Sequence, residues 1–333
     1  MLPFKLVYHN GYDLRLGPHV FPTEKYRLIR DGLVAGGVAD AANILAPEPA
    51  RDEDILRVHT AEYVGKLKNE TLTATERMRL EIPCSQETVE AFWLAAGGSI
   101  LAAQQAMRDG FAVNLGGGFH HAFPGHGEGF CMIHDVAVAI RRLQRDDKIH
   151  TAMTVDCDVH QGNGTAAIFA GTRTASALLP SSSVSTVEHP KNAPRGKMRG
   201  AHAGDVFTIS LHQHNNYPLW KPPSSIDVDL PDGCGDDDYL AWLDNALSSG
   251  LRQFEPDLIC YVAGADPYRE DQLGGLNLSI EGLRRRDELV FRVARARNIP
   301  VMVTYAGGYA QDVEDTVTIH SNTVVAAKEV FTA

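Results

Sequence analysis

Short apolar runs recur along the chain, and most are followed by glycine or polar residues and then by a segment with helical spacing. Runs of this length and composition are typical of strands that are buried on both faces. The pattern predicts strands at residues 5–9, 42–45, 111–115, 149–155, 206–211, 258–262 and 299–304.

Apolar residues at three- and four-residue intervals, among them Val89, Phe92 and Trp93, predict a long helix over residues 86–109. Another helix begins near Phe21, where Thr23 is the candidate N-cap. Residues 69–84 are polar and ambiguous. Further helices are predicted at residues 52–58, 61–67, 135–145, 165–170, 236–254 and 279–297, and at the end of the chain.

This alternation of strands and helices favours an α/β fold with a mainly parallel, multi-stranded sheet flanked by helices on both faces. The length of 333 residues allows one large domain or two, and we expect a single domain over residues 1–333. In such sheets, ligands bind beyond the carboxyl ends of the strands. The candidate functional residues are therefore the polar residues that follow the predicted strands.

The composition narrows the possible functions. A net charge of −11 and a pI of about 5.7 argue against direct nucleic-acid binding, which needs a basic surface. No apolar run is long enough to span a bilayer, and the first residues do not resemble a signal peptide. Five cysteines without a CxxC pair favour reduced thiols over a disulfide framework. We therefore expect a cytoplasmic protein without membrane contact.

The segment DCDVH, residues 156–160, follows one of the apolar runs. On an extended chain alternate side chains share a face, so Asp158 and His160 can converge on one cation while Asp156 meets another polar group. Carboxylate oxygens and an imidazole nitrogen suit zinc or another first-row divalent metal. An ordinary solvated turn after a strand is the alternative interpretation.

Six polar residues follow predicted strands in this way. Because the carboxyl ends of parallel strands meet at one edge of a sheet, we expect the six to form a shared site. They are His120, His121, Asp158, His160, Asp266 and Tyr309.

The segments around these residues resemble the histone deacetylase family. The shared motifs are, in chain order, GGGFHHAFPGHGEGFC, VDCDVHQGNG, VFTISLH, GADPYREDQLGGL and AGGYA. The segments HNGYDLRLGPHVFPTEKY, NNYP and LGGLNLSIEGLRRRDELVF are similar to a bacterial branch near the class IV deacetylases. The resemblance implies the arginase/deacetylase fold, one catalytic zinc ion (Zn2+) and hydrolysis of the amide of an acylated amine, typically acyl-lysine.

By this resemblance, Asp158, His160 and Asp266 bind the zinc and leave an open position for water and the substrate carbonyl. His120 and His121 would contact that water and the departing amine and supply a general base and a general acid. Tyr309 would donate a hydrogen bond to the oxyanion that develops on the carbonyl.

Each of the two adjacent histidines is expected to have a partner that fixes its tautomer, Asp156 for His120 and Asn163 for His121. Many members of the family carry an aspartate at the second place, and other branches use asparagine. Asn163 cannot ionise, so we expect a lower pKa for His121 than an aspartate would give it.

The resemblance also implies a tunnel for the acyl-lysine side chain, with Gly129 and Phe130 on one wall and Tyr217 on the other. A structural monovalent cation, K+, is expected near the zinc. Its ligands would be side-chain oxygens of Asp156 and Ser210 and main-chain oxygens of Asp158, His160 and Leu211.

The chain departs from the family at residues 172–204, where the family has only a few residues. Serine, proline, glycine and basic residues dominate this insert, and no apolar periodicity is present. We expect the insert to be disordered and to lie on the face of the domain away from the site.

Other functions remain open at this stage. The substrate could be acetylpolyamine or another small acylated amine. A binuclear manganese ureohydrolase is disfavoured, because Asn163 and the single Asp266 motif leave a second metal short of ligands. A catalytically silent relative is disfavoured because all expected polar positions are filled. The sequence does not determine the acyl length, the choice between zinc and iron, or the oligomeric state.

Overall fold

A parallel β-sheet forms the centre of the molecule. The computed structural model describes residues 2–14, 16–170 and 205–332. Within these residues eight strands pair in the order β2-β1-β3-β8-β7-β4-β5-β6, and every pairing is parallel. The strands are β1 (Lys5–Val7), β2 (Ile44–Leu45), β3 (Phe111–Asn114), β4 (Ala152–Asp156), β5 (Val206–Gln213), β6 (Ile226–Leu230), β7 (Leu258–Val262) and β8 (Val301–Thr304).

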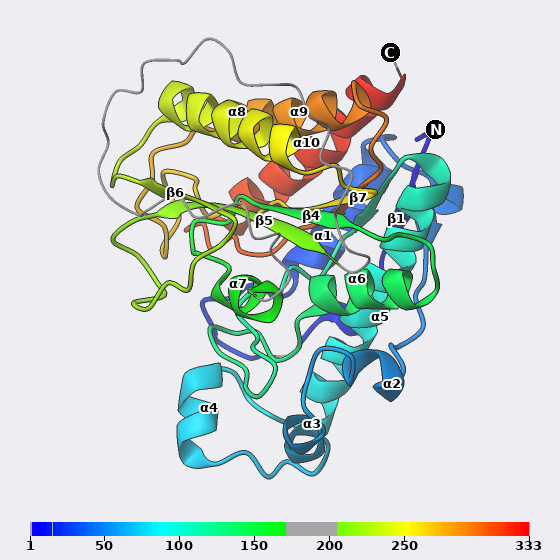
Figure 1. Cartoon of the computed structure of the whole chain (residues 1–333), viewed down its shortest axis with the longest axis vertical. Coiled ribbons are helices and arrows are strands. Elements are labelled where there is room, and N and C mark those ends of the chain that lie inside the picture. Colours follow the sequence, from blue (N-terminus) through cyan, green and yellow to red (C-terminus); the bar gives the residue numbers. More distant parts are fainter. Residues whose placement is uncertain (1, 15, 171–204, 333) are drawn as a thin grey trace.

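Helices cover both faces of this sheet (Figure 1). The helices α8, α9 and α10 lie on one face, and α5 and α6 lie on the other. The α-helices of the described residues are α1 (Lys25–Ala35), α2 (Asp52–Ile55), α3 (Ala61–Lys68), α4 (Ala74–Leu80), α5 (Gln86–Asp109), α6 (Asp135–Arg145), α7 (Asn163–Phe169), α8 (Asp236–Gln253), α9 (Ile280–Arg295) and α10 (Val313–Thr332).

Coverage on both faces explains why the central strands are continuous apolar runs. All residues of β3, β4, β7 and β8 are buried, as expected for strands that have helices on each side. The α/β fold and the seven predicted strands are confirmed, with ends that differ by up to three residues. Ser279 is confirmed as the N-cap of α9, because its side chain accepts a hydrogen bond from Gly282 N.

Three local expectations need correction. Thr23 does not cap α1: its hydroxyl donates to Asp13 at 2.5 Å, and the N-cap residue is Glu24, without a side-chain cap. The helix α4 lies in the segment without a clear pattern, and it begins with a capping box between Thr73 and Glu76. Strand β6 was not expected, because at the edge of the sheet it is only half-buried and contains Asp227 and Asp229.

The strand order determines where the site forms. The neighbouring strands β3, β8, β7 and β4 are parallel, so the loops that follow them leave the sheet at the same edge. These four loops contain the six polar residues that the sequence singles out. The insert at residues 172–204 lies outside the described residues.

Candidate metal centre and active site

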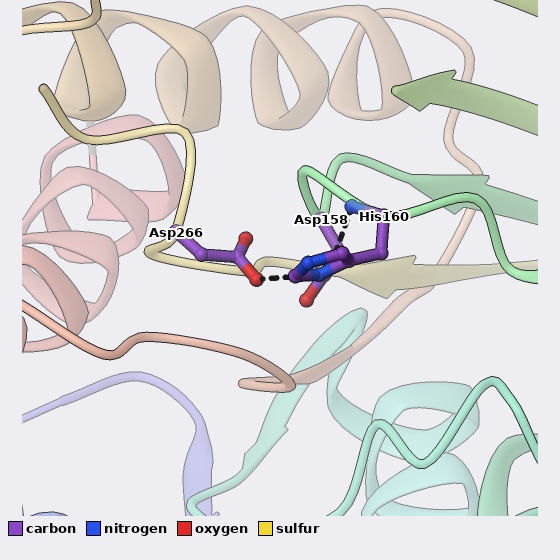
Figure 2. Close-up of side chains that lie close together, drawn as sticks. All are labelled: Asp158, His160 and Asp266. Atoms are coloured by element: carbon purple, nitrogen blue, oxygen red, sulfur yellow. Dashed lines mark hydrogen bonds and ion pairs between the residues drawn. The ribbon is translucent and has the colours of Figure 1, made fainter. Parts of the chain in front are cut away.

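Two carboxylates and one imidazole converge beyond the ends of β4 and β7 (Figure 2). Asp158, His160 and Asp266 are buried, and one potential ligand atom from each lies within 4.8 Å of the others. His160 Nδ1 is 3.0 Å from Asp158 Oδ1 and 3.3 Å from Asp266 Oδ2. Residues separated by more than 100 positions therefore offer ligands to a single point.

Backbone donors from neighbouring loops hold these carboxylates. Gly307 N donates to Asp158 Oδ2 at 2.9 Å, and Val159 N donates to Asp266 Oδ1 at 2.8 Å. The glycine is required at position 307, because a Cβ there would lie 2.0 Å from Asp266 Oδ2. The loops after β4, β7 and β8 are thus tied together through the ligand side chains.

The arrangement fits a divalent cation. Asp266 Oδ2 is buried and makes no well-formed hydrogen bond with the described residues beyond its 3.3 Å contact with His160 Nδ1, and such an atom is costly unless a cation meets it. Burial, with a further contribution from Asp158, raises the pKa of the Asp266 carboxyl to about 7. Oxygen and nitrogen ligands in this number are typical of a catalytic zinc site with a free coordination position.

His120 and His121 follow β3 and lie beside this centre, with ring centroids 4.1 Å apart. His120 Nδ1 is 2.7 Å from Asp156 Oδ2, and His121 Nδ1 is 2.7 Å from Asn163 Oδ1. Both expected pairs are therefore present. In each pair the partner contacts Nδ1 of the histidine, so Nε2 is not used by that partner. His120 Nε2 lies 3.7 Å from Asp158 Oδ1.

The two imidazoles have different electrostatic environments. Burial disfavours the charged form of His120, but Asp156 and Asp158 outweigh that effect and raise its pKa to about 9. Burial lowers the pKa of His121 well below its usual value, and the neighbouring His120 and His160 lower it further. Adjacent groups with separated pKa values are a common feature of acid–base sites.

Tyr309 lies in the loop after β8, and its backbone is held on both sides. Its N–H donates to Asp271 Oδ2 at 2.7 Å, and its carbonyl accepts from Gln272 Nε2 at 2.9 Å. Burial raises the pKa of its hydroxyl well above the usual value, and Asp158 and Asp266 act in the same direction. The hydroxyl therefore keeps its proton and can donate a hydrogen bond.

Of the three residues expected to line a tunnel, Gly129 and Tyr217 lie next to His121, and Phe130 lies next to Tyr309. The ring centroid of Tyr217 is 4.9 Å from that of His121, and the ring centroid of Phe130 is 6.0 Å from that of Tyr309. Gly129 has a positive φ of 54°, and a Cβ on it would approach His121 Cδ2 to 2.8 Å and Tyr217 Cε1 to 3.1 Å. Only glycine fits this close approach without strain.

The residues expected to bind a monovalent cation lie on the adjacent strands β4 and β5 and in the loop after β4. Asp156 and Ser210 are register partners of β4 and β5. Ser210 Oγ is 2.9 Å from His212 Nδ1, and Asp156 Oδ1 accepts a hydrogen bond from Asp158 N at 3.1 Å. The K+ site, including Leu211, stays a prediction.

Three charged residues near the site lie within the quoted family-like segments, but the sequence assigned them no role. Lys25 is fully buried and donates to Ala306 O at 2.8 Å, three residues before Tyr309. Arg286 is also fully buried and donates to Gly264 O at 2.6 Å. Glu128 accepts from Asn163 at 2.5 Å. Charged residues on helices and loops usually point to solvent, so the sequence alone does not single them out.

The fold and the site together define a class: an α/β protein with a candidate mononuclear metal centre and two adjacent histidines at the carboxyl edge of a parallel sheet. The histone deacetylase domain model matches residues 19–324. The chain belongs to the histone deacetylase family, and is thus a deacetylase-like hydrolase.

Relatives match over most of the chain. An uncharacterized protein of Picosynechococcus sp. is 36% identical over 98% of this chain and 99% of its own length. Histone deacetylase 2 of Arabidopsis thaliana is 31% identical over 91% of this chain and 74% of its own. A histone deacetylase-like amidohydrolase of Pseudomonas aeruginosa is 25% identical over 88% of this chain and 73% of its own.

Solved structures share the fold. The HDA15 HD domain superposes with a TM-score of 0.75 at 21% identity, covering 98% of this chain and 88% of that chain. An HDAC homolog complexed with SAHA gives a TM-score of 0.74 at 22% identity, covering 98% and 84%. None of the described helices is both long enough and apolar enough to cross a membrane.

Proposed function

We propose that this protein is a zinc-dependent deacylase that removes acyl groups, acetyl in the first instance, from lysine side chains. The observation that supports this most directly is the convergence of Asp158, His160 and Asp266 beside His120 and His121. In a chain of the histone deacetylase family, this set contains every group that metal-assisted amide hydrolysis needs.

A zinc ion held by Asp158, His160 and Asp266 would supply Lewis acidity to the acyl carbonyl and to an attacking water. His120 and His121 would take a proton from that water and deliver one to the departing amine, through their Nε2 atoms. Their Nδ1 atoms are occupied by Asp156 and Asn163, which fix the ring orientations. Tyr309 would donate its hydroxyl proton in a hydrogen bond to the developing oxyanion.

The substrate would enter between two aromatic walls. Tyr217 beside His121 and Phe130 beside Tyr309 would form these walls and would enclose the four-carbon stem of an acyl-lysine. Ejecting water around the stem would strengthen the electrostatic interactions at the carbonyl. The proposed substrate is thus an acylated lysine side chain of a peptide or protein.

We also propose that a K+ ion binds near the zinc through Asp156, Ser210 and the main chain of Asp158, His160 and Leu211. The pairing of Asp156 with Ser210 across β4 and β5 supports this placement. A cation there would act on His120 through Asp156.

All five cysteines are free, which supports a reducing, cytoplasmic location.

The proposal is tested by loading the metal-free protein with zinc and measuring hydrolysis of a fluorogenic acetyl-lysine peptide. Turnover that a zinc-chelating hydroxamate blocks supports the proposal. Parallel assays with longer acyl groups and with acetylpolyamine determine the substrate class. A zinc-loaded, folded protein that hydrolyses acetylpolyamine but no acyl-lysine peptide would overturn the lysine assignment and leave the deacylase chemistry in place.

A further inference from the structure

Glu128 lies between the His121–Asn163 pair and the tunnel wall, and the proposed hydrolysis gives it no role. Its Oε1 atom accepts hydrogen bonds from Asn163 Nδ2 at 2.5 Å and from the Tyr217 hydroxyl at 3.0 Å. Its Oε2 atom is 3.3 Å from His126 Nε2. The side chain is only 14% exposed, so these partners replace most of its contact with water.

The contacts of Asn163 fix the orientation of its amide. Gly164 N can only donate, and it lies 3.0 Å from Asn163 Oδ1, the atom that also faces His121 Nδ1. The Glu128 carboxylate can only accept, so it must face the amide nitrogen. Because the amide oxygen faces His121, the hydrogen of that imidazole lies on Nδ1 and the Nε2 atom faces the site.

Glu128 is a carboxylate in this environment. Burial favours its neutral form, but hydrogen bonds from His126, Asn163 and Tyr217 outweigh that effect and hold its pKa below the usual value. The next residue is Gly129, whose backbone approaches both His121 and Tyr217. A displacement of Glu128 would therefore move the tunnel wall as well as Asn163.

We infer that Glu128 is a positioning residue of the active site, which joins Asn163 and Tyr217 in one hydrogen-bonded unit and requires a donor at position 163. A carboxylate at position 163 could serve the N–H of His121 as well as an amide oxygen does. It would, however, face Glu128 at hydrogen-bond distance with two acceptors and no hydrogen between them. Positions 128 and 163 are thus chemically matched.

A double-mutant cycle tests this match with Asn163→Asp, Glu128→Gln and the double variant. For the zinc-loaded proteins, we expect Asn163→Asp to lower kcat/KM by about tenfold or more, because two carboxylates repel. Glu128→Gln should stay within about threefold of wild type, since its amide oxygen can still accept from Asn163. The double variant should regain about tenfold over Asn163→Asp, because the glutamine amide can donate to the new carboxylate.

Thermal unfolding of the same four metal-free proteins is the readout that needs no activity. Asn163→Asp should lower the midpoint, and adding Glu128→Gln should raise it again. The proposal is overturned if Asn163→Asp matches wild type, or if the double variant is no better than Asn163→Asp. Only the kinetic part of this test rests on the proposed function. If the wild type is inactive, the proposed deacylase function is refuted, and the unfolding measurements still test whether positions 128 and 163 are matched.

A second comparison tests the link to the tunnel wall. Glu128→Ala removes the acceptor of both Asn163 and Tyr217, so it should raise KM and lower kcat, each by at least about threefold. Tyr217→Phe removes only the wall bond and should change KM more than kcat. The conservative Glu128→Gln should restore most of what Glu128→Ala loses. If kcat and KM of Glu128→Ala both stay within twofold of wild type, the positioning role is wrong.

Discussion

Single polar atoms at the site are held by partners that a sequence does not reveal. Lys25 illustrates this, because its ammonium group is fully buried, donates to Ala306 O and lies 5.8 Å from the centre of the Tyr309 ring. Burial lowers its pKa to about 8, although Asp266, Asp158 and Asp271 oppose that effect. The sequence predicted Tyr309 through its motif, but it assigned no role to Lys25, the lysine that supports the Tyr309 loop.

Tyr309→Phe tests the oxyanion donor. We expect kcat to fall by about 10²-fold or more, because one such donor contributes roughly that factor. The zinc content should not change, since the tyrosine is not a ligand. Steady-state kinetics and metal analysis of the same preparation check both parts. Tyr268→Phe is the matched control, because it removes a partly buried hydroxyl that donates to Asp315, outside the proposed machinery. An unchanged rate for Tyr309→Phe would refute the assigned role.

His59 links stability to pH. Its Nδ1 lies 3.0 Å from Phe123 O, its Nε2 accepts from His134 N at 3.0 Å, and burial lowers its pKa to about 4. Between that value and the unfolded value of about 6.5, the unfolded state binds more protons than the folded state. The contribution to stability is therefore complete above pH 6.5 and is lost as the pH falls towards 4, by about 3 kcal/mol in total.

Urea unfolding of the metal-free protein between pH 4.5 and 7.5 measures this dependence. The free energy of unfolding of the wild type should decrease as the pH falls. The free energy of unfolding of His59→Asn should decrease less steeply over the same range, because asparagine does not titrate. Its asparagine can still donate to Phe123 O, so the variant is expected to fold. Parallel pH profiles for the two proteins would contradict the assignment to His59.

Whole elements were predicted best where one periodic pattern determines them. The helix α5 has the predicted bounds, because its apolar positions repeat over 24 residues and Ser85 caps its start. The helix α4 and the strand β6 were missed, because α4 is short and β6 alternates aspartates with apolar residues at a half-exposed edge. Thr23 has the residue type of an N-cap, but its hydroxyl has a tertiary partner in Asp13. Tertiary contacts override local preference in such cases.

The packing of α5 leads to a prediction against helix propensity. Alanine favours a helix over glycine by about 1 kcal/mol, and yet Gly97→Ala should destabilise the protein. A Cβ at position 97 would lie 1.9 Å from Glu48 O and 2.9 Å from Ala50 N, which are backbone atoms and cannot turn aside as the end of a flexible side chain can. Overpacking of this kind costs about 1–3 kcal/mol.

Gly32→Ala in α1 is the matched control for that helix. No atom lies within 4 Å of a Cβ at position 32, so the variant should be more stable by up to about 1 kcal/mol. Thermal or urea unfolding of both variants checks the opposite signs. Stabilisation by Gly97→Ala would mean that α5 does not pack against residues 48–50 in solution.

Across the whole molecule, the site depends on strand order. The sequence predicted that polar residues after parallel strands would meet, and the order β8-β7-β4 brings Asp158 and Asp266 together from positions 108 residues apart. The sequence did not predict that order, because it depends on which helices pack together. It also assigned no role to Arg286, which ties the loop after β4 to the loop after β7 by donating to Cys157 O at 3.3 Å and Gly264 O at 2.6 Å.

Metal binding should therefore stabilise the whole fold. In the metal-free protein, the carboxylates of Asp158 and Asp266 are buried close together, and their mutual repulsion is relieved only in part by His160. Zinc that binds only the folded state at 100 times its Kd adds about 2.7 kcal/mol, which raises the unfolding midpoint by about 4 °C for a chain of this size. Zinc should bind only the folded state, because the ligands lie on loops that unfolding separates. A chelator that removes the zinc should therefore reverse the shift in the unfolding midpoint.

Asp266→Asn distinguishes stabilisation by zinc bound at this site from stabilisation by zinc bound elsewhere on the protein. The substitution removes one of the two buried charges and can keep the hydrogen bond from Val159 N, so the metal-free variant should unfold at or above the wild-type temperature. It should lose most of the zinc-induced shift, because one ligand becomes a neutral amide. Asp238→Asn, which removes an exposed charge at the start of α8, should keep the full shift. Scanning calorimetry of the three proteins with and without zinc decides the matter, and a full shift in Asp266→Asn would place the metal elsewhere.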